Sequence, residues 1–365
     1  MKVGILTFHG ADNYGAVLQA FALQEYIRSL NNDVDMVNYS PKAVLKDYKT
    51  FSFAFSNTFT GVKKYLLHPL ILLRRFIRII PFTRRAKKFD NFRKCFFDLS
   101  EPSYTDIEKI PQDYDAYVIG SDQVWNTKIS QDGEPVYFGK FKKNINSICI
   151  SYAASAGDGE ELLNTSESFD DFDAISVREI SLKNLLQSKF NIASEIVADP
   201  TLLVEPEVWN QVAATSTYNT PEKYVLVYMV YYTEKALSIA KKIARKKNMK
   251  VLIIDFCRIT KNHFISPIGP EDFVSLFKNA SYVVTTSFHG TVFSVIFNRN
   301  FYFVSTKRKG ENRVRLLLND LKLEHRIIDD TPELKPIDYA YAMKILPELR
   351  ASSEAFLQKT LIKKE

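Results

Sequence analysis

The strongest constraint on this chain is a repeated alternation of short apolar segments with longer amphipathic ones. Residues 2–8 form an apolar run that ends in a polar turn, apolar positions then recur at helix spacing over 14–30, and 33–38 is a second apolar run. Strand, helix and strand in this order predict a parallel sheet flanked by helices. The same order restarts with apolar runs at 224–230 and 250–254. The pattern therefore predicts an α/β protein.

Two such series in one chain predict two Rossmann-like domains that face a cleft. The stretch between the series is rich in Pro, Thr, Ser and Asn, which is typical of an inter-domain linker. In open parallel sheets, ligands bind at the carboxyl ends of the strands, so we examine the residues that follow each predicted strand. We expect an N-terminal domain over 1–205, a linker over 206–223, a C-terminal domain over 224–330 and C-terminal helices over 331–365.

The charge of the chain is concentrated in one insertion within the first domain. The whole chain carries +7, yet residues 61–94 hold eleven Lys and Arg and one acid, so this segment carries +10 and the rest −3. Because the rest of the chain is near neutral and no recognition motif accompanies the segment, we expect no nucleic-acid partner. Its cations alternate with apolar residues over a stretch too short to span a bilayer, which favours an amphipathic helix on an anionic membrane.

The alternative is that this segment packs on the N-terminal domain and turns its charges to water. The sequence also lacks the apolar stretch and cleavage site of a secretory signal and any apolar run long enough to cross a membrane. We therefore expect a cytoplasmic protein with peripheral contact at the inner face of the membrane.

The segment over 282–299 carries the most informative candidate site. An apolar strand there runs into Ser287, Phe288, His289 and Gly290, and an apolar helix opens at the glycine. A helix N-terminus attracts anions, and Gly290 permits close approach of the backbone. Ser287 and His289 can hydrogen-bond an oxyanion or move a proton near neutral pH. The alternative interpretation is a buried histidine that caps its own helix.

Two turns of the first domain also place polar residues after strands. The first contains Asp12, Asn13 and Tyr14; it matches neither the dinucleotide-binding nor the P-loop pattern, and turn chemistry alone explains Asn13. In the second, over 120–126, Asp122 is a candidate base and Trp125 a candidate platform for the apolar face of a sugar. A helix cap explains Asp122 equally well.

Arginine residues supply candidate anion anchors. Arg178 ends a predicted strand, and its planar guanidinium suits a carboxylate or a phosphate. A structural ion pair with Glu179 or Asp199 is the alternative. The later cations Lys307, Arg313 and Arg315 would usually lie on a solvated face, but they follow the strand-to-helix segment of His289 in chain order. The chain shows no metal-ligand spacing, so we expect no metal or other cofactor.

Five motifs taken together resemble the polysaccharide pyruvyl transferase family over about residues 1–320. They are NYGAVLQAFAL at 13–23, GSDQVWN at 120–126, SVRE at 176–179, ADPTLL at 198–203 and SFHGTVFS at 287–294. The resemblance implies a GT-B-like fold and transfer of the pyruvyl group of phosphoenolpyruvate to a sugar, often as a cyclic ketal. It places this reaction in the synthesis of bacterial exopolysaccharide, capsule or cell-wall polymers, where the acceptor is commonly carried on polyprenyl diphosphate.

One position departs from the family pattern. Many members have an arginine two residues before the histidine, where this chain has Ser287. We expect other cations to supply that charge, His289 to act as the general acid, and Asp122 or Asp12 to act as the base. The candidate donor-binding residues are Arg178, Ser287, Gly290, Arg313, Arg315 and Lys307, and the candidate acceptor-binding residues are Asn13, Tyr14, Trp125 and Asn126.

Two other functions fit the same predicted fold. One is a glycosyltransferase that uses a nucleotide sugar, because a fold does not fix a function. The other is a catalytically inactive protein that binds a membrane or a polymer.

Overall fold

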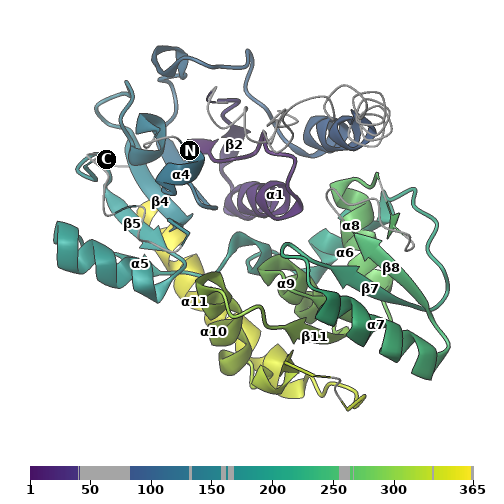
Figure 1. Cartoon of the computed structure of the whole chain (residues 1–365). Helices are drawn as coiled ribbons and strands as arrows, with labels where there is room; N and C mark the ends of the chain where they lie inside the picture. Colours follow the sequence, from purple (N-terminus) through teal and green to yellow (C-terminus); the bar gives the residue numbers. More distant parts are fainter. Residues whose placement is uncertain are drawn as a thin grey trace, which may run out of the picture.

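The computed structural model describes residues 1–39, 41, 83–130, 134–157, 162, 168–254, 264–265, 267–330 and 333–362. Within them the chain forms two six-stranded parallel sheets flanked by helices (Figure 1). The predicted α/β class with two Rossmann-like halves is therefore confirmed.

The N-terminal sheet has the strand order β2-β1-β3-β4-β5-β6, so the direction in which strands are added reverses between β1 and β3. Such a reversal opens a crevice at the carboxyl ends of the two strands. The strands are β1 (Lys2–Leu6), β2 (Asp33–Met36), β3 (Ala116–Ile119), β4 (Ile148–Ala154), β5 (Ala174–Val177) and β6 (Glu195–Ile196). The helices are α1 (Tyr14–Ser29), α4 (Thr127–Ser130) and α5 (Ile180–Leu185), and the short helical turns are η1 (Ile107–Lys109), η2 (Pro135–Phe138), η4 (Leu186–Phe190) and η5 (Pro200–Leu202).

The C-terminal sheet has the order β12-β11-β10-β7-β8-β9, which is the strand order of the Rossmann fold with its reversal between β7 and β10. Its strands are β7 (Tyr224–Tyr228), β8 (Lys250–Ile254), β9 (Phe264–Ile265), β10 (Tyr282–Thr285), β11 (Asn300–Val304) and β12 (Ile327–Ile328). Its helices are α6 (Pro206–Ala214), α7 (Glu234–Lys247), α8 (Pro270–Asn279), α9 (Phe288–Ile296), α10 (Asn312–Asp320) and α11 (Ala340–Thr360), with the turns η6 (Lys309–Glu311) and η7 (Glu324–Arg326).

Helix α1 lies between the two halves (Figure 1). It is buried on nearly all of its faces, which is expected of a helix whose apolar residues run around its whole circumference. Tyr14, its first residue, stacks on Phe273 of α8 with ring centroids 4.6 Å apart and donates a hydrogen bond of 3.1 Å to the carbonyl of Ile268. One hydrophobic cluster extends from the N-terminal half through α1 into the C-terminal half. The halves therefore share a core beside the site.

Two further helices tie the halves together. Helix α6 falls inside the range 206–223 that the sequence predicts as a linker; it packs on α8, and its Trp209 ring contacts Phe21 of α1 with centroids 5.8 Å apart. Helix α11 crosses back to the N-terminal half, where the Ser353 hydroxyl accepts a hydrogen bond of 2.7 Å from the backbone of Ala198. Arg350 of the same helix lies 2.7 Å from Glu205.

The described end of the basic segment is a helix over 83–96. Phe89 and Phe92 are buried, and Arg93 donates a hydrogen bond of 2.8 Å to the Asp12 carboxylate. Lys88 pairs with Asp272 of the C-terminal half. Residues 83–94 therefore pack on the protein, as the alternative interpretation expects, whereas 61–82 lie outside the described residues. No helix in the described part of the chain is long and apolar enough to cross a membrane.

Candidate active site

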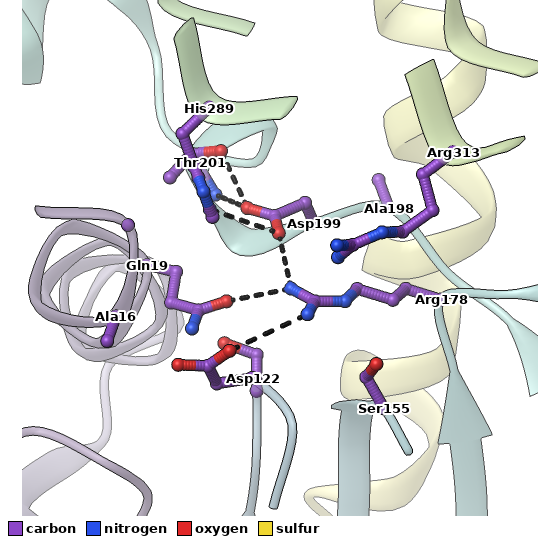
Figure 2. Close-up of polar contacts among 12 residues, drawn as sticks. Ala16, Gln19, Asp122, Ser155, Arg178, Ala198, Asp199, Thr201, His289 and Arg313 are labelled. Atoms are coloured by element: carbon purple, nitrogen blue, oxygen red, sulfur yellow. Dashed lines mark hydrogen bonds and ion pairs between the residues drawn. The ribbon is translucent and has the colours of Figure 1, made fainter. Parts of the chain in front are cut away.

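Four neighbouring strands of the N-terminal sheet place polar side chains at one edge. Asp122 follows β3, Ser155 follows β4, Arg178 and Glu179 follow β5, and Asp199 follows β6. The carboxyl ends of parallel strands meet at the same edge of a sheet, so these side chains converge although they are far apart in sequence. Figure 2 shows the Arg178 guanidinium among Gln19 of α1 and two of these carboxylates.

The Arg178 side chain is the centre of this cluster and is only 3% exposed. Its Nε donates to Glu179 at 3.1 Å, and its Nη1 donates to Gln19 and to Asp199, both at 3.0 Å. Its Nη2 lies 3.6 Å from Asp122 Oδ1. Burial lowers the pKa of Arg178, but the surrounding carboxylates outweigh that effect and leave it above the ordinary value. The structure thus shows the ion pairs with Glu179 and Asp199 that the alternative interpretation of Arg178 expects.

An irregularity between β4 and β5 directs the loops of this cluster. The register shifts between Ser151 and Ala154, and the serines on the two strands exchange hydrogen bonds, with Ser151 Oγ donating to the Ser176 carbonyl at 3.1 Å and Ser176 Oγ to the Ser151 carbonyl at 2.9 Å. Such bulges bend a strand and redirect the side chains that follow. Beyond it, Ser155 Oγ donates to Glu179 Oε1 at 2.9 Å, which orients that carboxylate toward Arg178.

The C-terminal half contributes His289 from the first turn of α9 (Figure 2). Its Nε2 lies 3.6 Å from Asp199 Oδ2. Asp199 is fully buried, and its other oxygen accepts hydrogen bonds from the backbone and hydroxyl of Thr201 at 3.1 and 2.6 Å. Burial raises the pKa of the Asp199 carboxyl, but His289 and Arg178 outweigh it, so the pKa lies below its ordinary value. Asp199 therefore stays ionised next to the imidazole.

Arg313 of α10 adds a second guanidinium beside Arg178 (Figure 2). Its Nη1 lies 3.5 Å from Glu179 Oε1, and its guanidinium stacks on the Phe288 ring at 5.1 Å. Burial and the charge of Arg178 lower the pKa of Arg313 below its ordinary value. An anion bound here would offset that repulsion.

Several buried polar atoms at this junction have no hydrogen-bond partner among the described residues. They are Gln19 Nε2, Glu179 Oε2, His289 Nε2 and Arg313 Nη1. Because most buried polar groups in proteins are hydrogen-bonded, a concentration of unsatisfied atoms marks a place where a polar ligand would bind. They come from both halves, so a ligand that satisfied them would lie at the junction.

The structure brings together four of the predicted site residues, His289, Asp122, Arg178 and Arg313. Asp12 is a correction: its carboxylate pairs with Arg93, and no contact joins it to this cluster in the part of the chain that the structure describes.

Two predicted acceptor-binding aromatics are also corrected. Trp125 is fully buried among Phe138, Phe169 and other core residues, and its Nε1 donates to the Tyr137 carbonyl at 2.7 Å, so it has no free face for a sugar. Tyr14 belongs to the core between the halves. The periodicity of the sequence cannot distinguish a buried aromatic residue after a strand from an exposed one.

Two predicted acceptor-binding asparagines make local contacts. The Asn13 side chain caps α1 by accepting from the backbone of Gly15 at 2.9 Å, and the Asn126 amide donates to Gln123 at 2.8 Å.

The remaining donor candidates lie apart from the Arg178 cluster. Ser287 Oγ caps α9 by accepting from the backbone of Gly290 at 3.3 Å, so that amide is not free to bind an anion. Arg315 is half-exposed and donates to Ser305 at 3.2 Å, and Lys307 is exposed. Among the residues that the structure describes, no group of three His, Cys, Asp or Glu side chains is arranged to bind a metal ion.

Sequence reasoning missed Gln19, Gly15 and the role of Glu179. Gly15 and Gln19 are four residues apart and therefore share one face of α1. Glu179 follows Arg178 directly, and the sequence analysis considers it only as an ion-pair partner of that arginine. The sequence signal that could have identified Gln19 is that it is a polar residue among the apolar positions of this helix.

Two Rossmann-type halves that meet at a polar junction are typical of the GT-B fold. The UDP-GlcNAc 2-epimerase of Neisseria meningitidis, solved bound to UDP-GlcNAc, superposes with a TM-score of 0.52 at 9% identity and full coverage of both chains. A putative UDP-N-acetylglucosamine 2-epimerase of Listeria monocytogenes gives 0.48 at 8% identity, covering 98% of this chain and 90% of that one. The ADP-heptose lps heptosyltransferase II of E. coli gives 0.36 at 11% identity, covering 98% and 99%. At 9% identity, the similarity to the Neisseria meningitidis epimerase shows the fold alone.

The sequence itself shows the family. The model of the polysaccharide pyruvyl transferase family matches residues 13–308, which is most of the chain. The protein therefore belongs to the polysaccharide pyruvyl transferase family. No curated protein sequence matches it significantly.

Proposed function

We propose that this protein transfers the pyruvyl group of phosphoenolpyruvate to a pair of hydroxyls on a sugar and closes a cyclic ketal. The observation that carries the proposal is the meeting of His289 with Asp199, Asp122 and two guanidiniums at the junction of the halves. This arrangement supplies a proton donor, carboxylates that can accept a proton, and positive charge for an anionic donor. Family membership supports the same reaction.

Arg313 is the donor anchor in this proposal. Arg178 already binds Glu179, Gln19 and Asp199, whereas Arg313 Nη1 is buried without a hydrogen-bond partner among the described residues. A guanidinium can bind a carboxylate or phosphate through two parallel hydrogen bonds. An anion at Arg313 would also relieve the repulsion between the two arginines. Arg178 then acts by holding the acidic residues in place.

The proposed reaction accounts for every bond and proton with the side chains described above. One sugar hydroxyl oxygen bonds to C2 of phosphoenolpyruvate while C3 takes a proton from His289. The bond from C2 to the phosphate oxygen then breaks, and phosphate leaves with the electron pair. The second hydroxyl bonds to C2 and closes the ketal. The two hydroxyl protons pass first to carboxylates of the site; one then returns to His289 and the other leaves with phosphate.

Asp122 is the base that we propose for the acceptor hydroxyl. Its side chain is partly exposed, and one carboxylate oxygen lies 3.6 Å from Arg178, so it is held in place yet reachable. Its backbone has a positive φ of 78°, a conformation that orients the side chain after β3. We propose that Glu179 accepts the proton of the second hydroxyl. Its Oε2 is buried and has no hydrogen-bond partner among the described residues.

Release of phosphate from phosphoenolpyruvate tests this proposal. The assay would use lipid-linked or aryl galactosides, mannosides and N-acetylmannosamines as acceptors. Loss of a general acid typically reduces turnover by about 10²–10⁴-fold, so His289→Ala should fall by that amount. His325→Ala, which changes an exposed histidine, is the matched control. Wild-type turnover by His289→Ala would contradict its role as general acid. A rise in melting temperature with nucleotide sugars, and none with phosphoenolpyruvate, would indicate a glycosyltransferase.

We also propose that the acceptor is a saccharide carried on polyprenyl diphosphate at an anionic membrane surface. Residues 61–82 hold five Lys and Arg and no acid, which supports this, because anionic lipid contributes about 1 kcal/mol per nearby Lys or Arg. Arg85 donates to the Asp12 backbone and is buried, so it is not a suitable target. A variant with Arg74, Arg75 and Arg78 changed to Ser should lose salt-sensitive binding to anionic vesicles. Equal sedimentation of this variant and the wild type would contradict the membrane proposal.

A further inference from the structure

The imidazole of His289 lies directly against Gly15 of α1. A Cβ atom added at Gly15 would be 2.4 Å from Nδ1 and 2.6 Å from Cε1 of that ring, closer than real Cβ contacts. Gly15 is the second residue of a regular helix, where glycine is destabilising by about 0.5–1 kcal/mol relative to alanine. The backbone does not require glycine here, since φ is not in the left-handed region. The contact with His289 is therefore the physical reason for a residue without a side chain.

The Nε2 side of the same ring faces Asp199. Nε2 lies 3.6 Å from a carboxylate oxygen that also accepts a hydrogen bond of 3.0 Å from Arg178. Asp199 is further fixed by the backbone and hydroxyl of Thr201. His289 belongs to the C-terminal half, whereas Gly15 and Asp199 both belong to the N-terminal half. The ring is thus confined on two edges by the half that does not carry it.

We propose that Gly15 and Asp199 are positioning residues that together fix the imidazole of His289 and make its orientation depend on the two halves being joined. The proposal rests on the proposed function only in taking His289 as the proton donor. Asp199 faces Nε2, and Gly15 covers the Nδ1 side of the ring. Among the described residues, Asp199 contacts the ring with a charged group, Arg178 pairs with that carboxylate, and the Phe288 ring centroid lies 5.4 Å from that of the imidazole.

A double-mutant cycle on stability tests the Gly15 contact without any substrate. Gly15→Ala should lower the urea midpoint of the wild-type protein, because the new methyl group collides with the imidazole. The same change should leave the midpoint unaltered or raise it in a His289→Ala background, where the collision is gone and alanine favours the helix. Gly4→Ala, whose methyl group would collide with Tyr114, is the matched control and should lower the midpoint equally in both backgrounds. An equal effect of Gly15→Ala in both backgrounds would overturn the proposal.

Ring nitrogen NMR tests the Asp199 contact. The His289 signals are identified by their absence from His289→Ala, and Asp199→Asn should change their chemical shifts because the group facing Nε2 changes from an acceptor to an amide. Asp272→Asn, a fully buried carboxylate paired with Lys88 elsewhere, should leave them unchanged. In the phosphate-release assay, Asp199→Asn should lower kcat at least tenfold with the KM for phosphoenolpyruvate unchanged. Unchanged ring shifts in Asp199→Asn would overturn the proposal, whereas absence of any phosphate release would overturn only the proposed function.

Discussion

Replacing Arg178 tests whether the carboxylates of the site depend on one buried guanidinium. Arg178 makes three hydrogen bonds of 3.0–3.1 Å to Glu179, Gln19 and Asp199, and an ion pair at 3.6 Å to Asp122. Lysine keeps the charge but cannot reproduce the planar set of donors, so Arg178→Lys should lose at least one charge-assisted hydrogen bond, worth about 1.5–3 kcal/mol. Alanine leaves buried carboxylates without their cation, and Arg178→Ala should destabilise by about 3–5 kcal/mol.

Urea unfolding followed by tryptophan fluorescence measures this effect in both halves. Trp125 lies in a cluster of the N-terminal half and Trp209 in the cluster that joins the halves, and both are fully buried. Arg245→Ala on the exposed surface of α7 is the control, with an expected change within about 0.5 kcal/mol. If Arg178→Lys unfolds at the same urea concentration as the control variant, the hydrogen bonds of Arg178 do not stabilise the site and the reasoning is refuted.

Three further predictions follow from single contacts. Trp125→Phe removes the donor to the Tyr137 carbonyl and should destabilise by about 1–3 kcal/mol with an unchanged acceptor KM; a raised KM at full stability would contradict the burial argument. Tyr14→Ala should destabilise by about 3–5 kcal/mol by opening a cavity against Phe273, and Tyr14→Phe by about 1 kcal/mol, measured in urea. The pKa of Asp199 is lowered in the folded protein, so its ionisation stabilises the fold above the ordinary value of 3.8 and this contribution is lost as the pH falls. Between pH 5 and pH 3, the free energy of unfolding of Asp199→Asn should therefore fall less steeply than that of the wild type. Equal slopes for the two proteins, measured by urea unfolding at each pH, would contradict this.

The fold was predictable because it follows from local patterns. Buried parallel strands are continuous apolar runs, and both series of such runs, beginning at residues 2 and 224, appear in the structure as six-stranded parallel sheets. The helix α6 inside the expected linker 206–223 was harder to predict, because its short amphipathic pattern starts at a proline and stands among turn-forming residues. Its stability comes from packing on α8, a contact that the sequence does not display.

The site was predictable only in part, because its contacts are made across the chain. His289 and Arg178 were identified from their places after strands, and both lie at the junction. Trp125 follows a strand in the same way, yet the next turn folds its ring into the core. Position after a strand fixes the edge of the sheet on which a residue lies, whereas the direction of its side chain depends on packing by distant segments. The pairing of Gly15 with His289 is a contact of this kind.

The charges at the junction favour a local contact with the proposed donor over a general attraction. The groups that contact one another there are three carboxylates, those of Asp122, Glu179 and Asp199, and two guanidiniums, so these five side chains sum to −1. A multiply charged anion such as phosphoenolpyruvate is disfavoured by that balance. The proposed donor must therefore bind through direct contact with Arg313, whose Nη1 is buried without a hydrogen-bond partner among the described residues.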